Sequence, residues 1–289
     1  MAKYLKIILL ILHITIFAFT AKSQEIKQSS GIRYFSGEKV FPVIFLDPLE
    51  SQVSGGAYYI TEDNYQLEEL IMLNHVNLGF NRPVFTWKTE KYDYEICLET
   101  TAFSLFQISR SELDNKLLGG LMNIDFKVGA SYGFSSEVNS FRIRYFHVSS
   151  HFGDDYIFRN SITLPNDRSG NYEQIDFTWL RAFNTSYVYA GAGGIISKYV
   201  YRERLSFWSG AYLTQVTGRE RLSLFESLNI RLIQEYSYNP DIRIVIGLNI
   251  MTSSKPAIRL WIEYYNGYLP YGVFHNKTSW FGLGASMTL

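Results

Sequence analysis

The stretch MNIDFKVGASY, from Met122 to Tyr132, alternates strictly between apolar residues and residues that are polar or small. Successive side chains of a β-strand point to opposite faces, so this stretch is predicted to form a strand with one apolar and one polar face. The same alternation occurs in DIRIVIGLNI (241–250), AIRLWIEYY (257–265) and TSWFGLGASMTL (278–289). Alternation over so much of the chain predicts an all-β protein.

The polar faces of these strands favour a membrane barrel over a soluble β-sandwich. A sandwich usually fills its water-facing side with lysine and glutamate, whereas these faces mix Arg, Asp, Glu, Asn, Gly and Ser, as a hydrated lumen does. The alternating segments are about 9–11 residues long, the length of a tilted strand that crosses a bilayer. Aromatic residues make up 17% of the chain, which suits the aromatic girdles of such barrels. We therefore predict a transmembrane antiparallel β-barrel in the outer membrane of a Gram-negative bacterium.

The number of alternating segments predicts about twelve strands, within a range of about 10–14, and residues 49–289 form the predicted barrel. If the first strand runs outward, the short connections 134–140 and 183–186 are periplasmic, and the long connection 151–171 is extracellular. Short inner turns and long outer loops are the usual asymmetry of these barrels. The strands are predicted to begin near Ser51, Asn74, Tyr92, Leu121, Ser140, Tyr172, Ser186, Leu205, Ser227, Asp241, Ala257 and Lys277.

The N-terminus has the features of an exported protein. Two lysines precede an apolar run, and Ala21 and Ser23 supply small residues for a signal-peptidase site. Residues 1–23 are therefore predicted to be a signal peptide, and residues 24–48 either a periplasmic segment or a plug. The only cysteine, Cys97, has no partner for an internal disulfide. The 27 basic and 27 acidic residues form no basic cluster, so no nucleic-acid partner is expected.

A candidate site lies in FRIRYFHVSSHFGDDY, where the apolar face of a strand carries a histidine and a serine. Arg142 and Arg144 must face the lumen, because a guanidinium in the hydrocarbon is costly. Parity then turns His147 and Ser149 toward the lipid, near the extracellular end of the strand. Glu173, on the returning strand, is expected to join them on the same outward patch.

These three residues have the chemistry of a serine hydrolase. In such a site an imidazole takes the hydroxyl proton of the serine, and a carboxylate orients the imidazole. We therefore consider Ser149 as nucleophile, His147 as base and Glu173 as its orienting acid, with an ester in a lipid as substrate. Ser150 or backbone amides near Gly153 are the candidates for an oxyanion hole.

The same residues also have a purely structural interpretation. Polar groups at the membrane interface cost only about 0–1 kcal/mol, so His147, Ser149 and Glu173 could be ordinary residues at strand ends. Asp154 and Asp155 could bind calcium at the base of the loop or simply be solvated. No cofactor is required by the proposed chemistry.

Two resemblances involve these residues. The H-x-S pair on a lipid-facing strand resembles outer-membrane phospholipase A and lipid A deacylase, which implies His147 as base, Ser149 as nucleophile and outer-membrane lipids as partners. The block from His147 to Tyr156 also resembles H-x-S-S-H-x-G-D-[DE]-[YF], a hallmark of a Gram-negative outer-membrane family defined only as a domain of unknown function. Further blocks at 41–59 and 262–274 extend this second resemblance over nearly the whole mature chain, and it implies a barrel without an activity.

Two functions therefore remain open. One is a lipid acyl-ester hydrolase that acts on lipopolysaccharide or phospholipid of the outer leaflet. The other is a non-enzymatic barrel, either a small channel or a scaffold for an assembly partner. A barrel of this size is narrow, and charged residues could cross-link to fill its lumen. The residues expected to do so are Arg142, Arg144, Arg243, Arg259, Asp125, Glu95 and Glu263.

Overall fold

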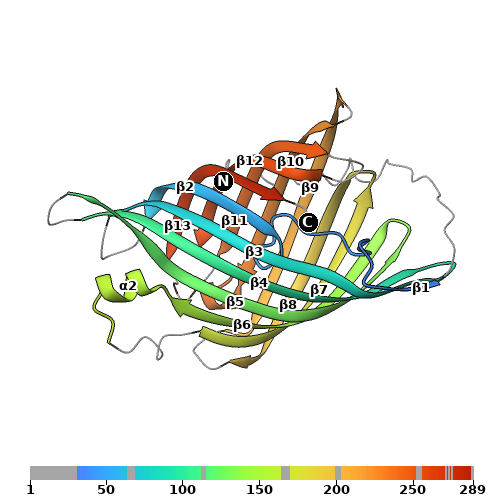
Figure 1. Cartoon of the computed structure of the whole chain (residues 1–289), viewed down its shortest axis with the longest axis horizontal. Helices are drawn as coiled ribbons and strands as arrows, with labels where there is room; N and C mark the ends of the chain where they lie inside the picture. The colour runs from blue at the N-terminus through green and yellow to red at the C-terminus, as the bar shows by residue number, and fades with distance from the viewer. Residues whose placement is uncertain are drawn as a thin grey trace.

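The protein forms a β-barrel, and a short N-terminal strand pairs with the last residues of one barrel strand (Figure 1). The computed structural model describes residues 31–63, 69–111, 115–163, 170–198, 203–219, 221–251, 256–270, 272, 274 and 276–287. The predicted signal peptide lies outside these described residues. The strands are β1 (Gly31–Tyr34), β2 (Val53–Asp63), β3 (Glu69–Lys88), β4 (Asp93–Arg110), β5 (Leu117–Ser136), β6 (Asn139–Phe152), β7 (Gly170–Phe183), β8 (Ser186–Lys198), β9 (Leu205–Arg219), β10 (Leu222–Ile233), β11 (Pro240–Met251), β12 (Pro256–Tyr268) and β13 (Lys277–Met287).

The barrel is closed by strands from the two ends of the chain. Each strand from β3 to β13 pairs antiparallel with the next, and β2 pairs with both β13 and β3. The closed barrel therefore contains the twelve strands β2 to β13, as the alternation predicted. The extra strand β1 pairs only with the far end of β3, from Phe85 to Lys88.

The predicted starts lie within two residues of the observed ones for nine of the twelve strands, and β8, β9 and β13 begin at the expected residues. The exceptions are β3 and β10, which begin five residues earlier than predicted, and β5, which begins four residues earlier. The lengths of the strands do not agree. The strands of the barrel have 11 to 20 residues, so they are longer than the 9–11 residues that were expected from the apolar segments. The longest are β3, β4 and β5, with 20, 18 and 20 residues.

The two ends of the barrel differ in their connections. At one end, called here the short-turn end, β5 joins β6 through residues 137–138 and β7 joins β8 through residues 184–185. At the other, the long-loop end, β6 joins β7 through residues 153–169, which include helix α2 (Asp154–Arg159), and a 3-10 turn η2 (Gln234–Tyr236) precedes β11. Neither helical segment in the described part of the chain is long and apolar enough to cross a membrane.

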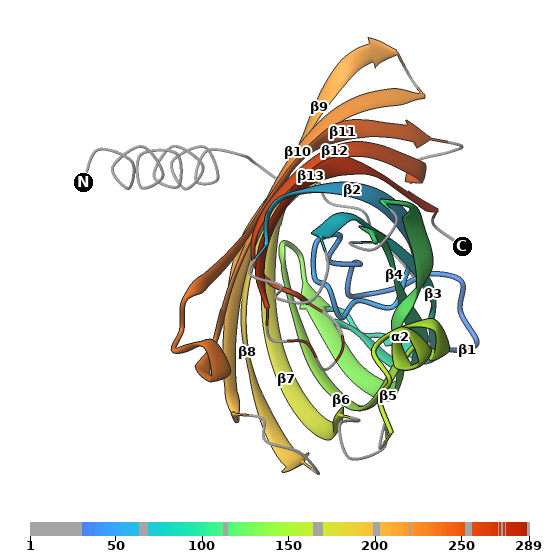
Figure 2. The same ribbon diagram turned by 90° about the vertical axis from the view of Figure 1, so that its left-hand side faces the viewer.

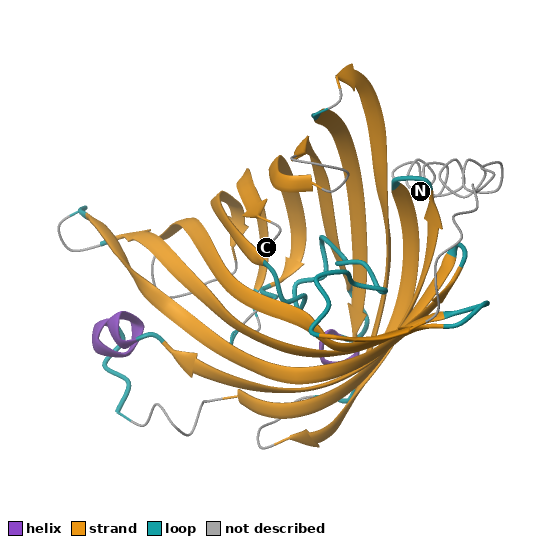
Figure 3. Cartoon of the chain, turned by 45° about the vertical axis from the view of Figure 1, so that its right-hand side comes forward, coloured by secondary structure: helices purple, strands orange, loops and turns teal. Residues whose placement is uncertain are grey.

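Residues 40–52 fold into the interior of the barrel and are called the plug (Figures 2 and 3). These residues include 40–48 of the segment 24–48, which was expected to be either periplasmic or a plug, and residues 24–30 of that segment lie outside the described residues. The apolar side chains of the plug pack against three sectors of the wall. Phe41 and Ile44 contact Leu180, Tyr189 and Trp208; Phe45 and Leu46 contact Tyr212, Phe225, Val245 and Trp261; Leu49 contacts Phe146, Val148 and Tyr172.

The wall also binds the plug through charged side chains on β5 and β6. Arg142 forms a bidentate pair with Glu50 of the plug, and Arg144 donates to Asp47 of the plug at 3.1 Å. Lys127 donates to the backbone carbonyl of Leu49 at 2.6 Å. The cations face inward as predicted, but their partners come from the plug, so the expected hydrated lumen is filled with chain.

Ion pairs within the wall and contacts to the plug backbone complete this interior. Arg243 and Glu263 were expected to cross-link, and Nε of Arg243 lies 3.2 Å from Oε1 of Glu263. Glu95 accepts hydrogen bonds from the backbone amides of Val40 and Phe41 at 2.7 and 3.1 Å. The expected cross-linking therefore exists, and part of it is directed at the N-terminal segment.

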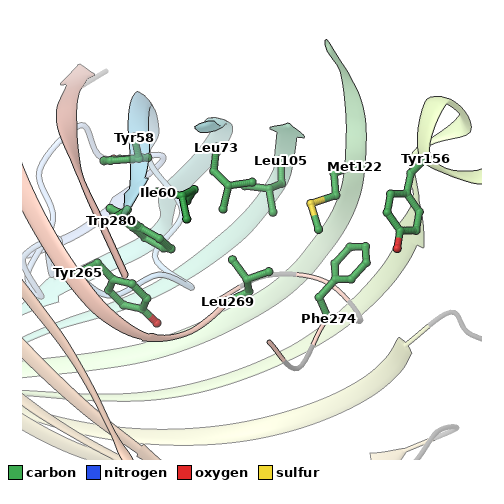
Figure 4. Close-up of a cluster of buried hydrophobic side chains, with 10 residues drawn as sticks. All are labelled: Tyr58, Ile60, Leu73, Leu105, Met122, Tyr156, Tyr265, Leu269, Phe274 and Trp280. Atoms are coloured by element: carbon green, nitrogen blue, oxygen red, sulfur yellow. The ribbon is translucent and has the colours of Figure 1, made fainter. Parts of the chain in front are cut away.

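An apolar cluster, called here the cap cluster, closes the long-loop end of the barrel (Figure 4). Met122 belongs to it, although alternation predicted that Met122 would share the outward face of Ile124. The pairing of β4 with β5 shifts register beside Leu105, and such a bulge turns one residue to the opposite face. The buried residues of the cap cluster are Tyr58, Ile60, Leu73, Leu105, Met122, Tyr156, Tyr265, Leu269, Phe274 and Trp280.

Candidate functional site

The direction of the side chains on β6 follows the predicted parity. Arg142 and Arg144 are only 2% and 1% exposed. The residue that follows each of them, Ile143 and Tyr145, is 47% exposed. Side chains with odd numbers therefore point out of the barrel. His147 shares this outward face, as was predicted from the position of the two arginines.

His147 and Glu173 lie beside each other on the outer wall. They are direct partners in the antiparallel register of β6 and β7, which places side chains of the same face within about 5.5 Å. Nδ1 of His147 is 3.6 Å from Oε1 of Glu173, and the two side chains are 41% and 32% exposed. The predicted imidazole–carboxylate pair is therefore assembled at the surface.

Ser149 makes its hydrogen bond with a different histidine from the one considered in the sequence. Oγ of Ser149 is 2.8 Å from Nε2 of His151. Because side chains at i−2 and i+2 share a face with residue i, both His147 and His151 flank Ser149 on the outward face. Ser149 therefore points toward His151 and the long-loop end of the barrel. His151 has the same outward parity as His147, and this parity could have identified His151 from the sequence.

Asn171 is a further member of the site that sequence reasoning missed. It is the direct partner of Ser149 across the β6–β7 pairing, and its Oδ1 is buried without a hydrogen-bond partner. Only the register could have placed it there, two residues from Glu173 on the same face of β7. The outer patch is defined here as His147, Ser149, His151, Asn171 and Glu173.

Two of the groups considered for an oxyanion hole, the Ser150 hydroxyl and the Gly153 amide, make other hydrogen bonds. Ser150 is 2% exposed and faces the interior, where its hydroxyl donates to Asp125. The amide of Gly153 donates to the carbonyl of Met122 at 2.9 Å. Asn171, by contrast, is the direct register partner of Ser149 on the outward face.

Asp154 and Asp155 form the first turn of α2 rather than an open loop. The carboxylate of Asp155 accepts a hydrogen bond from the amide of Leu121 at 2.9 Å, and the side chain of Asp154 is exposed. Within the described residues no group of three or more His, Cys, Asp or Glu side chains is placed to hold a metal ion. Calcium binding here stays a prediction.

The outer patch combines the groups that an ester hydrolase needs with an apolar surrounding. A hydroxyl is hydrogen-bonded to an imidazole, and a second imidazole lies against a carboxylate, which are the elements of nucleophilic catalysis. Around the patch the outward face carries exposed apolar side chains, which suit the acyl chains of a lipid. These are Phe126, Val128, Ile143, Tyr145, Ile175 and Phe177.

Several solved structures are similar to this barrel. The outer membrane phospholipase of Salmonella typhi, a dimer with bound calcium, is 10% identical with a TM-score of 0.53, over 84% of this chain and 93% of that one. The outer membrane phospholipase A of Escherichia coli is 10% identical with a TM-score of 0.53, over 86% of this chain and 95% of that one. The transport unit of the Escherichia coli autotransporter AIDA-I is also 10% identical, over 86% and 94%, with a TM-score of 0.46. At such low identities the likeness shows the fold of an outer-membrane β-barrel alone.

The sequence itself matches a family rather than a single relative. None of the curated proteins compared with the chain matches it. The model of the family described as "Protein of unknown function (DUF1207)" matches residues 36–289, which include the plug, all twelve strands of the barrel and the outer patch. The chain belongs to this family, DUF1207.

Proposed function

We propose that the protein is an integral outer-membrane barrel that hydrolyses acyl esters of lipids at its outer patch. The outward face of the barrel supports the membrane location, because exposed apolar side chains occur on most of its strands and such a surface is stable only in contact with lipid. Among the most exposed are Leu78, Leu98, Val128, Ile246, Ile262 and Leu283.

The hydrogen bond between Ser149 and His151 carries the proposal. Its length of 2.8 Å lies within the reach required for a nucleophile and its general base. In the proposed reaction Oγ of Ser149 attacks the acyl carbonyl, and His151 takes the hydroxyl proton at Nε2. His151 then gives this proton to the departing alcohol of the lipid, which leaves an acyl-serine.

Water completes the cycle. His151 takes a proton from the water as it attacks the acyl-serine, and the fatty acid leaves as Ser149 regains its proton. Asn171, opposite Ser149, is proposed to donate a hydrogen bond to the oxyanion. His147 and Glu173 form an imidazole–carboxylate pair beside the serine, and a rotation of Ser149 about χ1 would make His147 the base instead.

Known proteins with this fold give independent support for the lipid substrate. Both phospholipases described above are named for action on phospholipid. This support concerns only phospholipid as a substrate class, since the likeness is one of fold.

Release of fatty acid by the purified barrel tests the proposal. The parent and Ser149→Ala are offered phospholipid and lipopolysaccharide in detergent, with calcium and with a chelator. We expect release by the parent, and a loss of about 10³-fold or more in Ser149→Ala. No release from either lipid, or equal release by the variant, would contradict the hydrolase. A dependence on calcium that Asp154→Asn removes would support the predicted ion.

A non-enzymatic scaffold is the second candidate. One observation favours it over catalysis, namely that Ser150 and the Gly153 amide are both occupied by other bonds, which leaves Asn171 as the sole proposed oxyanion donor. The filled interior disfavours the small channel, because the plug is bound to the wall by buried ion pairs. Absence of hydrolysis together with co-purification of a stoichiometric partner would support the scaffold.

A further inference from the structure

The wall of the barrel is incomplete at the short-turn end, between β3 and β13 (Figure 1). The pairing of β2 with β3 stops at Ser54 and Asn77, and the pairing of β1 with β3 begins at Phe85. Residues 78–83 of β3 therefore have a strand neighbour on the β4 side only, as far as the described residues extend. In a membrane, such an edge is tolerated only where it lines a cavity or is covered by protein.

The last residues of the plug cover part of this edge from the inside. A Cβ atom added to Gly79 would collide with the backbone of Ser51 and Gln52. Only glycine permits this close approach of two backbones. The plug thus leaves the interior directly beneath the incomplete part of the wall and continues into β2.

A cavity of about 490 Å³ lies at the same place. Its lining includes Leu180 and Arg259, which face the interior, and also Phe80 and Met287, which face outward with exposures of 49% and 46%. The cavity reaches both faces at the short-turn rim, where residues 78–83 of β3 have no strand neighbour on the β2 side among the described residues. The volume falls within the range of about 300–1,000 Å³ that is typical of small-molecule sites.

The lining is cationic and contains no acidic residue. Its charged members are Lys39, Arg82 and Arg259. Arg259 lies over the rings of Phe45 and Tyr212, at 5.3 and 5.9 Å from their centroids. Its Nε is buried without a hydrogen-bond partner, and none of the three cations has a carboxylate within ion-pair distance in the described part of the chain. Three such charges around one cavity strongly favour an anion.

Other groups in the lining fit the two ends of an amphiphile. Both side-chain atoms of the Asn81 amide are buried without hydrogen-bond partners, so they add a donor and an acceptor near the cations. The rest of the wall is largely apolar, and it includes Val40, Pro42, Val43, Leu180, Ala182, Met251 and Met287. A lining that combines cations and an amide with apolar side chains has the groups that a charged head group and its hydrocarbon chain require.

We propose that this cavity binds a single-chain anionic amphiphile, with a carboxylate or phosphate head group at Arg259, Lys39 and Asn81. The ligand enters from the surrounding lipid through the gap between β3 and β13. The hydrocarbon chain lies against Leu180 and Ala182. This inference uses no residue of the outer patch, so it stands whether or not Ser149 acts as a nucleophile.

Binding of cis-parinarate, a fluorescent long-chain carboxylate, tests the site with the full chain in lipid nanodiscs. We expect saturable binding of one ligand per barrel, weakened about tenfold by Arg259→Gln, which corresponds to about 1.4 kcal/mol. Lys39→Gln, at the half-buried residue just before the plug, should act in the same direction if Arg259→Gln fails to fold. Lys277→Gln, a cation at the other end of the barrel, is the matched control and should leave binding unchanged.

Displacement of the probe by other amphiphiles tests the head-group selectivity of the site, and the association rate of the probe tests its route of entry. Palmitate and lysophosphatidylglycerol should both displace the probe if charge alone is recognised, and palmitate alone if the site selects carboxylate. Displacement by neutral dodecanol as effective as that by palmitate would overturn the anionic site, as would unchanged binding in both cation variants. Phe80→Glu at the rim should slow association relative to Leu98→Glu on the outward face of β4, and equal rates would overturn the lateral entry.

Discussion

Glu50 in the plug accepts two parallel hydrogen bonds from the guanidinium of Arg142 on β6, at 3.0 Å to Oε1 and 2.9 Å to Oε2. The side chains are 0% and 2% exposed. A bidentate pair of this kind fixes both distance and orientation. It therefore determines where the plug sits in the barrel as well as how firmly it is held.

Removal of one partner of this pair should loosen the plug. In Glu50→Ala the guanidinium of Arg142 would remain buried without its carboxylate, which typically costs about 3–5 kcal/mol. We expect a lower midpoint of thermal unfolding, and ion conductance across planar bilayers where the parent shows little.

An exposed ion pair provides the control for this variant. Glu38 lies 3.6 Å from Arg33, and both side chains are more than half exposed. Glu38→Ala should change stability by about 0–1 kcal/mol and leave conductance at the level of the parent. If the two alanine variants behave alike, the buried pair does not hold the plug.

The charge of Asp47 should make the attachment of the plug sensitive to acid. Burial raises the pKa of the Asp47 carboxyl, but the positive charges of Arg144, Arg231 and Arg142 outweigh burial and lower the pKa from 3.8 to about 2. A pKa that is lower in the folded chain than in the unfolded chain means that the ionised form stabilises the fold. This stabilisation, about 2 kcal/mol by linkage, is complete above the unfolded pKa and is lost as the pH falls toward 2.

Thermal unfolding as a function of pH measures this effect. The unfolding midpoint of the parent should fall between about pH 4 and pH 2, and Asp47→Asn should remove part of that slope. Asp93→Asn, which affects a partly exposed pair with Lys88, should keep the full slope. An unchanged slope in Asp47→Asn would show that other carboxylates cause the acid response.

Local alternation was enough to predict the wall of the barrel. The period of two is a property of each strand by itself, so the starts of β8, β9 and β13 and the outward position of His147 could be read from neighbouring residues. Alternation fails where a bulge adds one residue, and for that reason Met122 faces the cap cluster instead of the outside.

The contents of the barrel could not be predicted in the same way. Residues 40–52 have no strand periodicity, and Glu50 meets a partner 92 residues later in the chain. For the outer patch, parity identified the outward face of β6. Which of His147 and His151 forms a hydrogen bond with Ser149 depends on the side-chain rotamer of the serine. Asn171 depends on the register between β6 and β7, which the sequence does not specify.

The loop after β12 should be destabilised by a single methyl group. Gly272 has a φ of +84°, and a Cβ atom there would lie 2.6 Å from Cγ of Asn123. Its amide also donates to Asp125 at 2.8 Å. In Gly272→Ala the left-handed backbone alone costs about 1–2 kcal/mol, so faster proteolysis of residues 269–276 is expected. Gly119→Ala has open space around it and should be cut at the rate of the parent.

The two histidines of the outer patch distinguish between two forms of the proposed hydrolase. If the hydrogen bond from Ser149 to His151 is the one used in catalysis, His151→Gln should reduce fatty-acid release by about 10²–10⁴-fold. His147→Gln and Glu173→Gln should then have smaller effects, similar to each other, since the two side chains form one pair. The reverse order, with release retained in His151→Gln and lost in both other variants, would make His147 the base and would require Ser149 to turn toward it before the acyl group is attacked.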